Sequence, residues 1–229
     1  LGIVYNSHSD LPKAIECFEK ASNNAREAGD RATEGEAYLK LGIVYKSRSD
    51  IPKAIECYEK ALKSAREAGD QAKEGEAYFH LGIVYQSCSD LPKAIECFQK
   101  ASNNAREAGD QATEGEAYLN LGIVYQSRSD LPKAIECYGK ASNNAREAGD
   151  QAKEGEAYLN LGIVYKSRSD LPKAIECYKK ASKNAREAGD RDKEGEAYLN
   201  LGMAYKSCSD LPKAIVSYKK ALKCAREAG

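Results

Sequence analysis

The sequence of 229 residues has no excess charge of either sign and no long apolar run. Lys plus Arg and Asp plus Glu each number 35, so the formal net charge is zero. Nucleic-acid binding usually requires a basic face, so the balance gives no reason to expect nucleic acid as a partner, nor an anionic membrane surface. Because no stretch reaches about 18 apolar residues, no segment is expected to span a bilayer.

The first residues, Leu1 to Tyr5, contain no starting Met, no basic region and no cleavage pattern. No signal peptide is therefore expected. The chain also begins in the middle of its own repeating pattern, so we interpret it as a segment cut from a longer protein. We expect that protein to be cytoplasmic.

Histidine is scarce, with only His8 and His80, and each occurs once at its repeat position. No Ser-His-Asp, Cys-His or paired-carboxylate site is local to a repeat, so we do not expect an enzyme. Nor does any His or Cys lie at chelating spacing, so neither a metal nor a cofactor is expected. Five of the eight cysteines fall on one repeat position, where neighbours about 10 Å apart are too distant for a disulfide, and we predict free thiols in a reducing compartment: Cys17, Cys57, Cys97, Cys137 and Cys177.

What the sequence does have is a 40-residue internal repeat. Leu-Gly opens the pattern, Ser-Asp-Leu/Ile-Pro-Lys-Ala-Ile follows, and Ala-Arg-Glu-Ala-Gly closes it. Residues 121–160 and 161–200 differ at only five positions, which indicates recent duplication or deliberate idealisation. We predict a single array over 1–229, about five and a half to six repeats, with incomplete terminal units: 1–40, 41–80, 81–120, 121–160, 161–200 and 201–229.

Each repeat is expected to form two helices. The first should run from about Asp30 to Ser47 with Asp30 as N-cap, and the second from about Asp50 to Ala68 with Asp50 as N-cap. Pro52 fits a first turn, and Gly69 fits a left-handed helix end. Since both connections are short, the helices should pack antiparallel. The predicted fold class is all-α, a right-handed superhelical solenoid of antiparallel helix pairs.

Helical periodicity assigns one face of each helix to a core. On the first helix this face holds Ala37, Tyr38, Leu41, Val44 and Tyr45, and Gly42 beside it should allow close approach. The complementary stripe on the second helix is Ala54, Ile55, Tyr58 and Ala61. Three repeated core positions account for all but one of the 18 aromatic residues, which favours packing over base stacking; Phe79 is the exception.

The first helix also carries apolar residues on its opposite side. Leu39 and Ile43 lie roughly 160° and 200° from Leu41, with Glu36, Lys40 and Lys46 around them. Either neighbouring repeats cover these apolar residues, or they face a partner. We take this face as the candidate binding site: Glu36, Leu39, Lys40, Ile43, Lys46, Glu76, Phe79, His80, Ile83, Gln86, Glu116, Leu119, Asn120, Ile123, Gln126, Glu156, Leu159, Asn160, Ile163, Lys166, Glu196, Leu199, Asn200, Met203 and Lys206.

The spacing of Leu41-Gly42, Tyr45, Ala54, Tyr58 and Ala61 resembles the tetratricopeptide repeat family. The longer 40-residue unit is similar to that of the Pins/LGN-type cell-polarity adaptors. The resemblance implies that first helices line a concave groove that grips partner peptides, and that Asn120, Asn160 and Asn200 match a groove asparagine; Lys40 and His80 replace it earlier. A second groove asparagine of those adaptors is Ile or Met here, which makes the groove more apolar.

The resulting hypothesis is a protein-interaction scaffold that binds an extended or short helical segment of a partner protein. The alternative is a self-associating array or spacer, possibly of consensus-like or designed sequence, that stacks end to end because its terminal units are incomplete.

Overall fold

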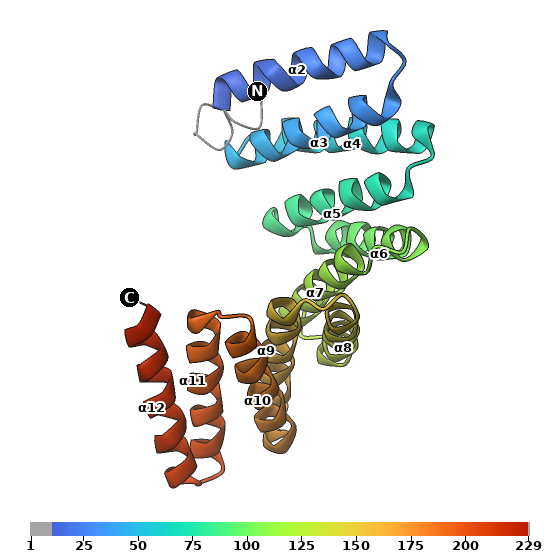
Figure 1. Cartoon of the computed structure of the whole chain (residues 1–229). Helices are drawn as coiled ribbons and strands as arrows, with labels where there is room; N and C mark the ends of the chain where they lie inside the picture. The colour runs from blue at the N-terminus through green and yellow to red at the C-terminus, as the bar shows by residue number, and fades with distance from the viewer. Residues whose placement is uncertain (1–10, 229) are drawn as a thin grey trace. The chain divides into compact units, whose positions relative to one another are not determined.

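A computed structural model describes residues 11–228, which contain eleven α-helices and no strand (Figure 1). The second helices of the repeats are α2 (Leu11–Glu27), α4 (Ile51–Ala68), α6 (Leu91–Glu107), α8 (Leu131–Glu147), α10 (Leu171–Glu187) and α12 (Leu211–Ala228). The first helices are α3 (Arg31–Ser47), α5 (Gln71–Ser87), α7 (Gln111–Ser127), α9 (Gln151–Ser167) and α11 (Arg191–Ser207). The pattern of paired antiparallel helices is confirmed. The expectations for Leu1 to Asp10 concern residues outside this range.

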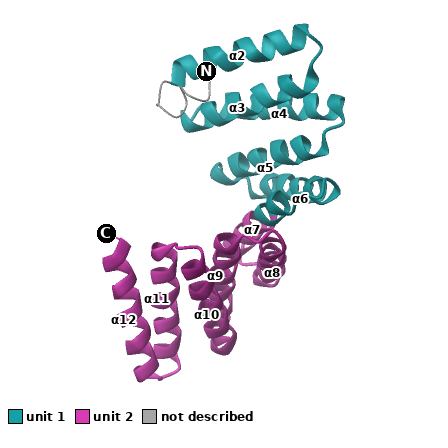
Figure 2. Cartoon of the chain, viewed as in Figure 1, with its two compact units in different colours: residues 1–117 teal, residues 118–229 magenta. Residues whose placement is uncertain are grey.

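Contacts divide the chain into two compact units, residues 1–117 and residues 118–229 (Figure 2). In the first unit, α3 packs on α4, and α5 packs on α6. In the second, α9 packs on α10, and α11 packs on α12. Consecutive pairs also touch: α4 contacts α5, and α10 contacts α11. The single array over 1–229 remains a prediction.

The helix ends follow the predicted capping chemistry. The Asp30 carboxylate accepts a hydrogen bond from the Thr33 backbone N–H at 3.0 Å, and Asp50 accepts one from the Lys53 N–H at 3.4 Å. Such a cap supplies a partner to an amide that the helix leaves unbonded, and is worth about 1 kcal/mol. Gly69 ends α4 in the left-handed conformation with φ 69°.

The turns within each pair contain a feature that the sequence did not reveal. A serine follows the first helix of every described pair and has φ between 59° and 61°, a conformation that normally favours glycine. In the first such turn, Ser49 N–H donates to the Lys46 carbonyl, and Asp50 N–H donates to the Tyr45 carbonyl. These bonds satisfy carbonyls at the end of α3 and reverse the chain. The serines are Ser49, Ser89, Ser129, Ser169 and Ser209.

The core lies between the two helices of each pair, as predicted. Leu41 and Val44 of α3 are buried together with Ala54, Tyr58 and Ala61 of α4. Burying one such large apolar side chain contributes about 1.5–3 kcal/mol relative to leaving it in water. The predicted core residues Tyr45 and Ile55 are only partly buried against this cluster.

Candidate functional site

The expected binding positions separate into buried and accessible ones. Leu39, Leu119 and Leu159 are buried, with exposed fractions of 1%, 5% and 4%. Leu39 belongs to the continuous core of the first unit, and Phe79 packs partly buried against the same core. These leucines therefore serve as packing residues, and their assignment as accessible anchors for a partner requires correction.

The physical reason is coverage by the following helix pair. In the first unit α3 contacts α5, and in the second unit α9 contacts α11, so the side of a first helix that carries the leucine position meets the next first helix. On α11, which has no first helix after it in this chain, Leu199 is 48% exposed. Neighbouring repeats thus cover this position, which is one of the two interpretations that the sequence allowed.

The next apolar position stays accessible in every described repeat. Its side chains are partly buried, neither enclosed in the core nor fully exposed. They lie beside the equally half-buried position that holds Lys, His or Asn. We call these two positions on each first helix the first-helix face: Lys40, Ile43, His80, Ile83, Asn120, Ile123, Asn160, Ile163, Asn200 and Met203.

Two asparagines of this face, Asn160 and Asn200, bond their own helix through the amide nitrogen. Asn160 Nδ2 donates to the Glu156 carbonyl of its own helix at 3.1 Å, and Asn200 Nδ2 donates to the Glu196 carbonyl at 3.1 Å. In this arrangement each amide oxygen remains an acceptor for a backbone N–H. Lys166 Nζ lies 3.9 Å from Met203 Sδ, so side chains of α9 and α11 meet on the face.

His80 differs from the other members of its position. Its ring stacks on Tyr58 with centroids 5.3 Å apart and planes 8° from parallel. Burial lowers the pKa of His80, so the ring is neutral at physiological pH. His80 therefore contributes an aromatic surface to the face, whereas Lys40 contributes a charge.

The position that follows the face determines whether a buried tyrosine hydroxyl has a hydrogen-bond acceptor. Tyr138 donates its hydroxyl to Gln126 Oε1 at 2.8 Å. At the equivalent of Gln126 the repeats of Tyr58 and Tyr178 carry Lys46 and Lys166, which have no lone pair to accept a proton. The Tyr58 and Tyr178 hydroxyls are buried and have no partner among the described residues.

The predicted row of glutamates flanks the face. Glu36 and Glu196 are exposed, and Glu76, Glu116 and Glu156 are half-buried. Glu76 pairs with Lys73 at 2.8 Å, and Glu196 with Lys193 at 3.6 Å. The remaining predicted positions, Gln86, Lys46, Gln126 and Lys166, are half-buried, while Lys206 is exposed.

A second glutamate position, represented by Glu34, joins successive helix pairs. Glu34 has only 5% of its side chain exposed and accepts from Arg26 at 2.8 Å and from Arg31 at 2.6 Å. Arg26 also bonds the Tyr38 hydroxyl. The same arrangement recurs in Arg186, Glu194 and Tyr198 of the second unit. The recurrence of Arg, Glu and Tyr at fixed spacing was the available signal for it.

The described cysteines are free thiols. Burial raises the pKa of Cys57, Cys97, Cys137 and Cys177 to about 11, so these thiols are protonated and unreactive at neutral pH. Within residues 11–228 no group of three His, Cys, Asp or Glu side chains is arranged to hold a metal ion. No helix in this range is both long and apolar enough to cross a membrane.

Sequence comparison identifies the family of this chain. Residues 1–67, 73–147 and 153–227 match the tetratricopeptide repeat. The chain therefore belongs to the tetratricopeptide repeat family, whose members commonly mediate protein–protein interactions and whose fold is generally non-catalytic. No curated protein matches the sequence.

Solved structures share the fold. BtubC from P. vanneervenii is 21% identical, with a TM-score of 0.82 over 95% of this chain and 92% of that chain. MamA is 26% identical, with a TM-score of 0.64 over 82% of this chain and 96% of that chain. A Rap protein complexed with competence and sporulation factor is 16% identical, with a TM-score of 0.68 over 99% of this chain and 73% of that chain.

Proposed function

We propose that this array binds an extended or short helical segment of a partner protein along the first-helix face. The observation that carries the proposal is the half-buried apolar position next to a position that holds Lys, His or Asn, repeated on every described first helix. These apolar side chains lie at the edge of the core and are not enclosed by it, whereas the leucine position is buried between repeats. Partly exposed apolar groups edged by oriented polar groups are typical of binding sites.

The chemistry of the face suggests the kind of ligand. Ile83, Ile163 and Met203 offer apolar contacts to spaced apolar side chains. Asn160 and Asn200 each hold their amide nitrogen on their own helix, so the free amide oxygen favours a ligand backbone N–H. The glutamate row favours Lys or Arg on the ligand. A peptide with alternating apolar and basic residues fits these requirements.

The resemblance of the 40-residue repeat to that of the Pins/LGN-type adaptors supports a role as an adaptor without catalytic activity. The Ile or Met at the second groove position argues for ligands more apolar than those of the adaptors themselves. A tetratricopeptide array that holds a peptide needs no cofactor, which agrees with the absence of catalytic motifs in the sequence.

The test starts from a library of displayed peptides selected on the whole chain. The affinity of the best peptide is then measured for the unchanged protein, for Ile163→Asp, and for the double variant Asn160→Ala with Asn200→Ala. We expect each to weaken binding about tenfold, since each hydrogen bond contributes about 0.5–1.5 kcal/mol and a buried carboxylate opposes apolar contact.

Ile215→Asp is the matched control, because it makes the same chemical change at a side chain that is 53% exposed on α12 and does not belong to the first-helix face. Circular dichroism establishes that all variants remain helical. If the face variants bind as tightly as the unchanged protein, or if Ile215→Asp weakens binding equally, the peptide binds elsewhere and the proposal is wrong.

A second candidate function is end-to-end association of copies of the chain. It is favoured by four apolar side chains on α11 and α12 that are about half exposed: Leu199, Leu211, Ile215 and Leu222. The positions of Leu39 and Leu62 in the first unit, equivalent to Leu199 and Leu222, are buried by a following helix pair. Light scattering over a dilution series measures the mass, and a mass that stays monomeric at every concentration excludes this candidate.

A further inference from the structure

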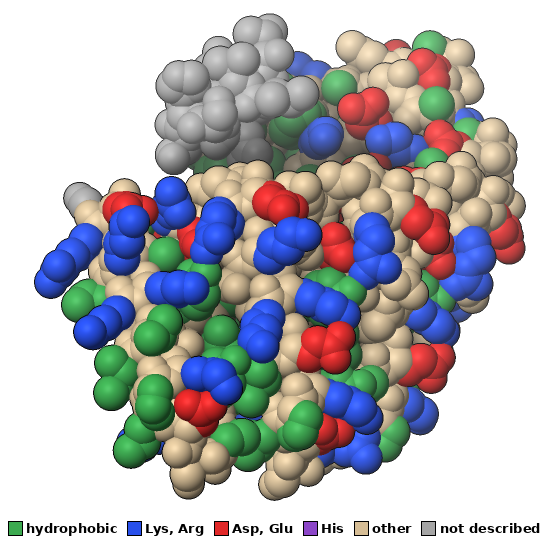
Figure 3. All heavy atoms as spheres, turned by 60° about the horizontal axis from the view of Figure 1, so that its bottom comes forward, with side chains coloured by type: hydrophobic (Ala, Val, Ile, Leu, Met, Phe, Trp, Pro, Cys, Tyr) green, Lys and Arg blue, Asp and Glu red, His purple; other side chains and the backbone are tan. Residues whose placement is uncertain are grey.

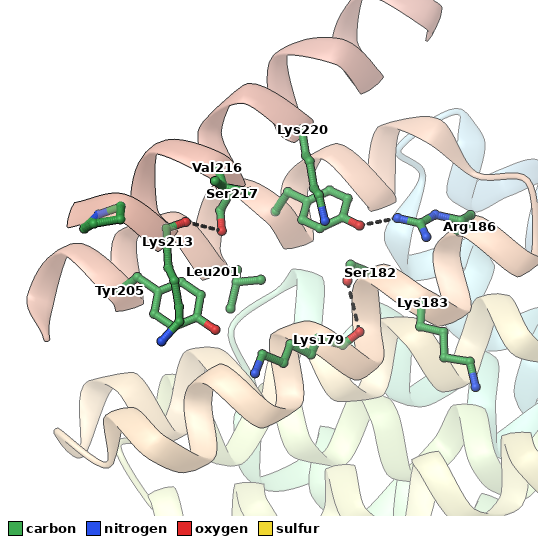
Figure 4. Close-up of a pocket in the computed structure, with 12 residues that line it drawn as sticks. Lys179, Ser182, Lys183, Arg186, Leu201, Tyr205, Lys213, Val216, Ser217 and Lys220 are labelled. Carbon is green, nitrogen blue, oxygen red and sulfur yellow. Dashed lines mark hydrogen bonds between the residues drawn. The ribbon is translucent and has the colours of Figure 1, made fainter. Parts of the chain in front are cut away.

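A groove lies between the second helices α10 and α12, with α11 at its floor, and has a volume of about 480 Å³ (Figure 4). Lys179 and Lys183 project from α10 on one side, and Lys213 and Lys220 project from α12 on the other. All of its walls belong to the second unit, and none of its lining residues belongs to the first-helix face. The groove is therefore a separate surface, and a ligand bound in it would be independent of the proposed function of the first-helix face.

The lining of this groove is cationic. Five basic side chains and no acidic one are found among the described residues that line it: Lys179, Lys183, Arg186, Lys213 and Lys220. Carboxylates outside the lining balance three of these charges. Glu194 pairs with Arg186 at 2.7 Å, Asp210 with Lys213 at 2.7 Å, and Glu187 with Lys183 at 3.7 Å.

The other two ammonium groups contact aromatic rings. Lys220 Nζ lies 5.1 Å from the centroid of the Tyr198 ring, and Lys179 Nζ lies 5.9 Å from that of Tyr205. The structure records no carboxylate partner for either lysine within residues 11–228. A cation over an aromatic face is stabilised only modestly, so its charge remains available to an incoming anion.

One substitution in the repeat explains why Lys220 lacks a carboxylate. At the position of Val216 the other repeats carry Glu, four residues before a Lys. In those repeats the two side chains bond, as in Lys60 with Glu56 at 2.7 Å and Lys180 with Glu176 at 2.8 Å. Valine removes this partner and places an apolar side chain, 52% exposed, at the edge of the groove.

The first unit contains the equivalent groove as a natural comparison. It lies between α2 and α4 and has a similar volume, about 470 Å³. Its lining includes two carboxylates, Glu19 and Glu56, at the positions that hold Lys179 and Val216 in the second unit. Glu19 accepts a hydrogen bond from the Tyr45 hydroxyl at 3.3 Å. The same backbone geometry thus carries a mixed charge in one unit and a positive charge in the other.

We propose that the groove between α10 and α12 binds an acidic, extended peptide segment of a partner protein. Carboxylates of the segment pair with Lys179 and Lys220, and an apolar side chain between them rests on Val216 and Leu201. On the face drawn in Figure 3, Lys and Arg side chains lie beside hydrophobic ones, with Asp and Glu side chains among them. A nucleic acid is a poorer fit, because it requires many phosphates to be neutralised and only two lysines lack a carboxylate.

The probe is a short fluorescein-labelled peptide that alternates glutamate with leucine, and binding to the whole chain is followed by fluorescence polarisation. The same peptide with glutamine in place of glutamate is its uncharged control. We expect the acidic peptide to bind, and we expect its affinity to fall with added salt. The glutamine peptide should bind at least about tenfold more weakly.

Variants of the protein locate the site. Lys179→Glu and Val216→Glu restore the residue types of the first repeats, and a glutamate at 216 is expected to pair with Lys220 as its equivalents do, so folding should be retained. Each substitution should lower the affinity for the acidic peptide about tenfold. Lys223→Glu is the matched control on α12, since Lys223 does not line the groove, and it should change the affinity less than about twofold.

Several results would overturn the proposal. The proposal would be wrong if the acidic peptide did not bind, or if it bound no better than the glutamine peptide. It would also be wrong if the two groove variants left the affinity for the acidic peptide unchanged, or if Lys223→Glu weakened that affinity as much as they do. An RNA oligonucleotide that binds more tightly than the acidic peptide and displaces it would make the groove a site for nucleic acid instead. Loss of binding in Ile163→Asp, with the groove variants unaffected, would place the acidic peptide on the first-helix face.

Discussion

Alanine at Gly162 and alanine at Gly139 make the same chemical change, and we expect them to shift stability in opposite directions. Gly162 lies in α9 against the ring of Tyr178, which is fully buried. A Cβ atom built on Gly162 would lie 2.5 Å from Tyr178 Cε1 and 2.6 Å from Cδ1. Gly139 lies in α8, and a Cβ atom there meets nothing within 4 Å.

The magnitudes follow from two effects. Glycine inside a helix costs about 1 kcal/mol relative to alanine, so both substitutions gain this amount through the backbone. Gly139→Ala should therefore raise the free energy of unfolding by about 0.5–1 kcal/mol. At Gly162 the ring has to move out of an enclosed position, and overpacking of this kind costs about 1–3 kcal/mol. The helix gain is common to both variants, so they should differ by about 1–3 kcal/mol.

Urea denaturation followed by circular dichroism measures this difference on the whole chain. Repeat arrays do not always unfold in one step, so the comparison uses the midpoint and slope of the transition of the second unit, where both glycines lie. The reasoning would be refuted if Gly162→Ala raised the midpoint as much as Gly139→Ala. That result would mean that the tyrosine ring is free to leave the glycine.

Three further predictions concern buried polar groups. Tyr138→Phe should lower the free energy of unfolding by about 0.5–1.5 kcal/mol in a urea titration because it removes the bond to Gln126, whereas Tyr178→Phe should cost nothing; equal losses would contradict this. Burial opposes ionisation of Glu194, but bonds from Arg186 and Arg191 hold its pKa below the ordinary value. The stability it provides should be present above its unfolded pKa of about 4.3 and lost as the pH falls through its folded pKa, and Glu194→Gln should flatten the acid limb of a stability–pH profile; unchanged acid limbs would count against it. A thiol-specific reagent at neutral pH should label the exposed Cys88 and Cys208 first, because Cys137 and Cys177 are buried. Equally fast labelling of Cys137 or Cys177 would contradict this prediction.

Much of the fold was predictable because it depends on local chemistry repeated at a fixed spacing. Asp30 and Asp50 cap α3 and α4 because each precedes a run of helix-forming residues. Gly69 ends α4 because glycine adopts the left-handed conformation without steric cost. The stripe of Leu41, Val44 and Tyr58 identified the core, since helical periodicity is visible in the sequence. The positive φ of the turn serines was not visible, because serine is rare in that conformation.

The candidate site was only partly predictable. Periodicity placed Leu39 and Ile43 on the same side of the first helix, and it cannot show which of the two a neighbouring helix pair covers. The structure buries Leu39 and leaves Ile43 accessible, because coverage depends on how successive pairs pack. Glu34 could not be assigned from the sequence for the same reason. Its contact with Arg26 of the preceding helix shows that it forms a packed ion pair and is not a solvated charge.

Local patterns in the sequence were enough to predict the family, the helix boundaries and the core stripe, because hydrophobic period, caps and turn residues act over a few neighbours along the chain. The packing of helix pairs was needed to show which residues on the second face of the first helices remain accessible and which lysines surround one groove. Lys179 and Lys220 are distant in sequence, and the meaning of Val216 emerges only where α10 and α12 flank the same space. Contacts between helix pairs settle those questions, since accessibility and charge balance depend on neighbours in space.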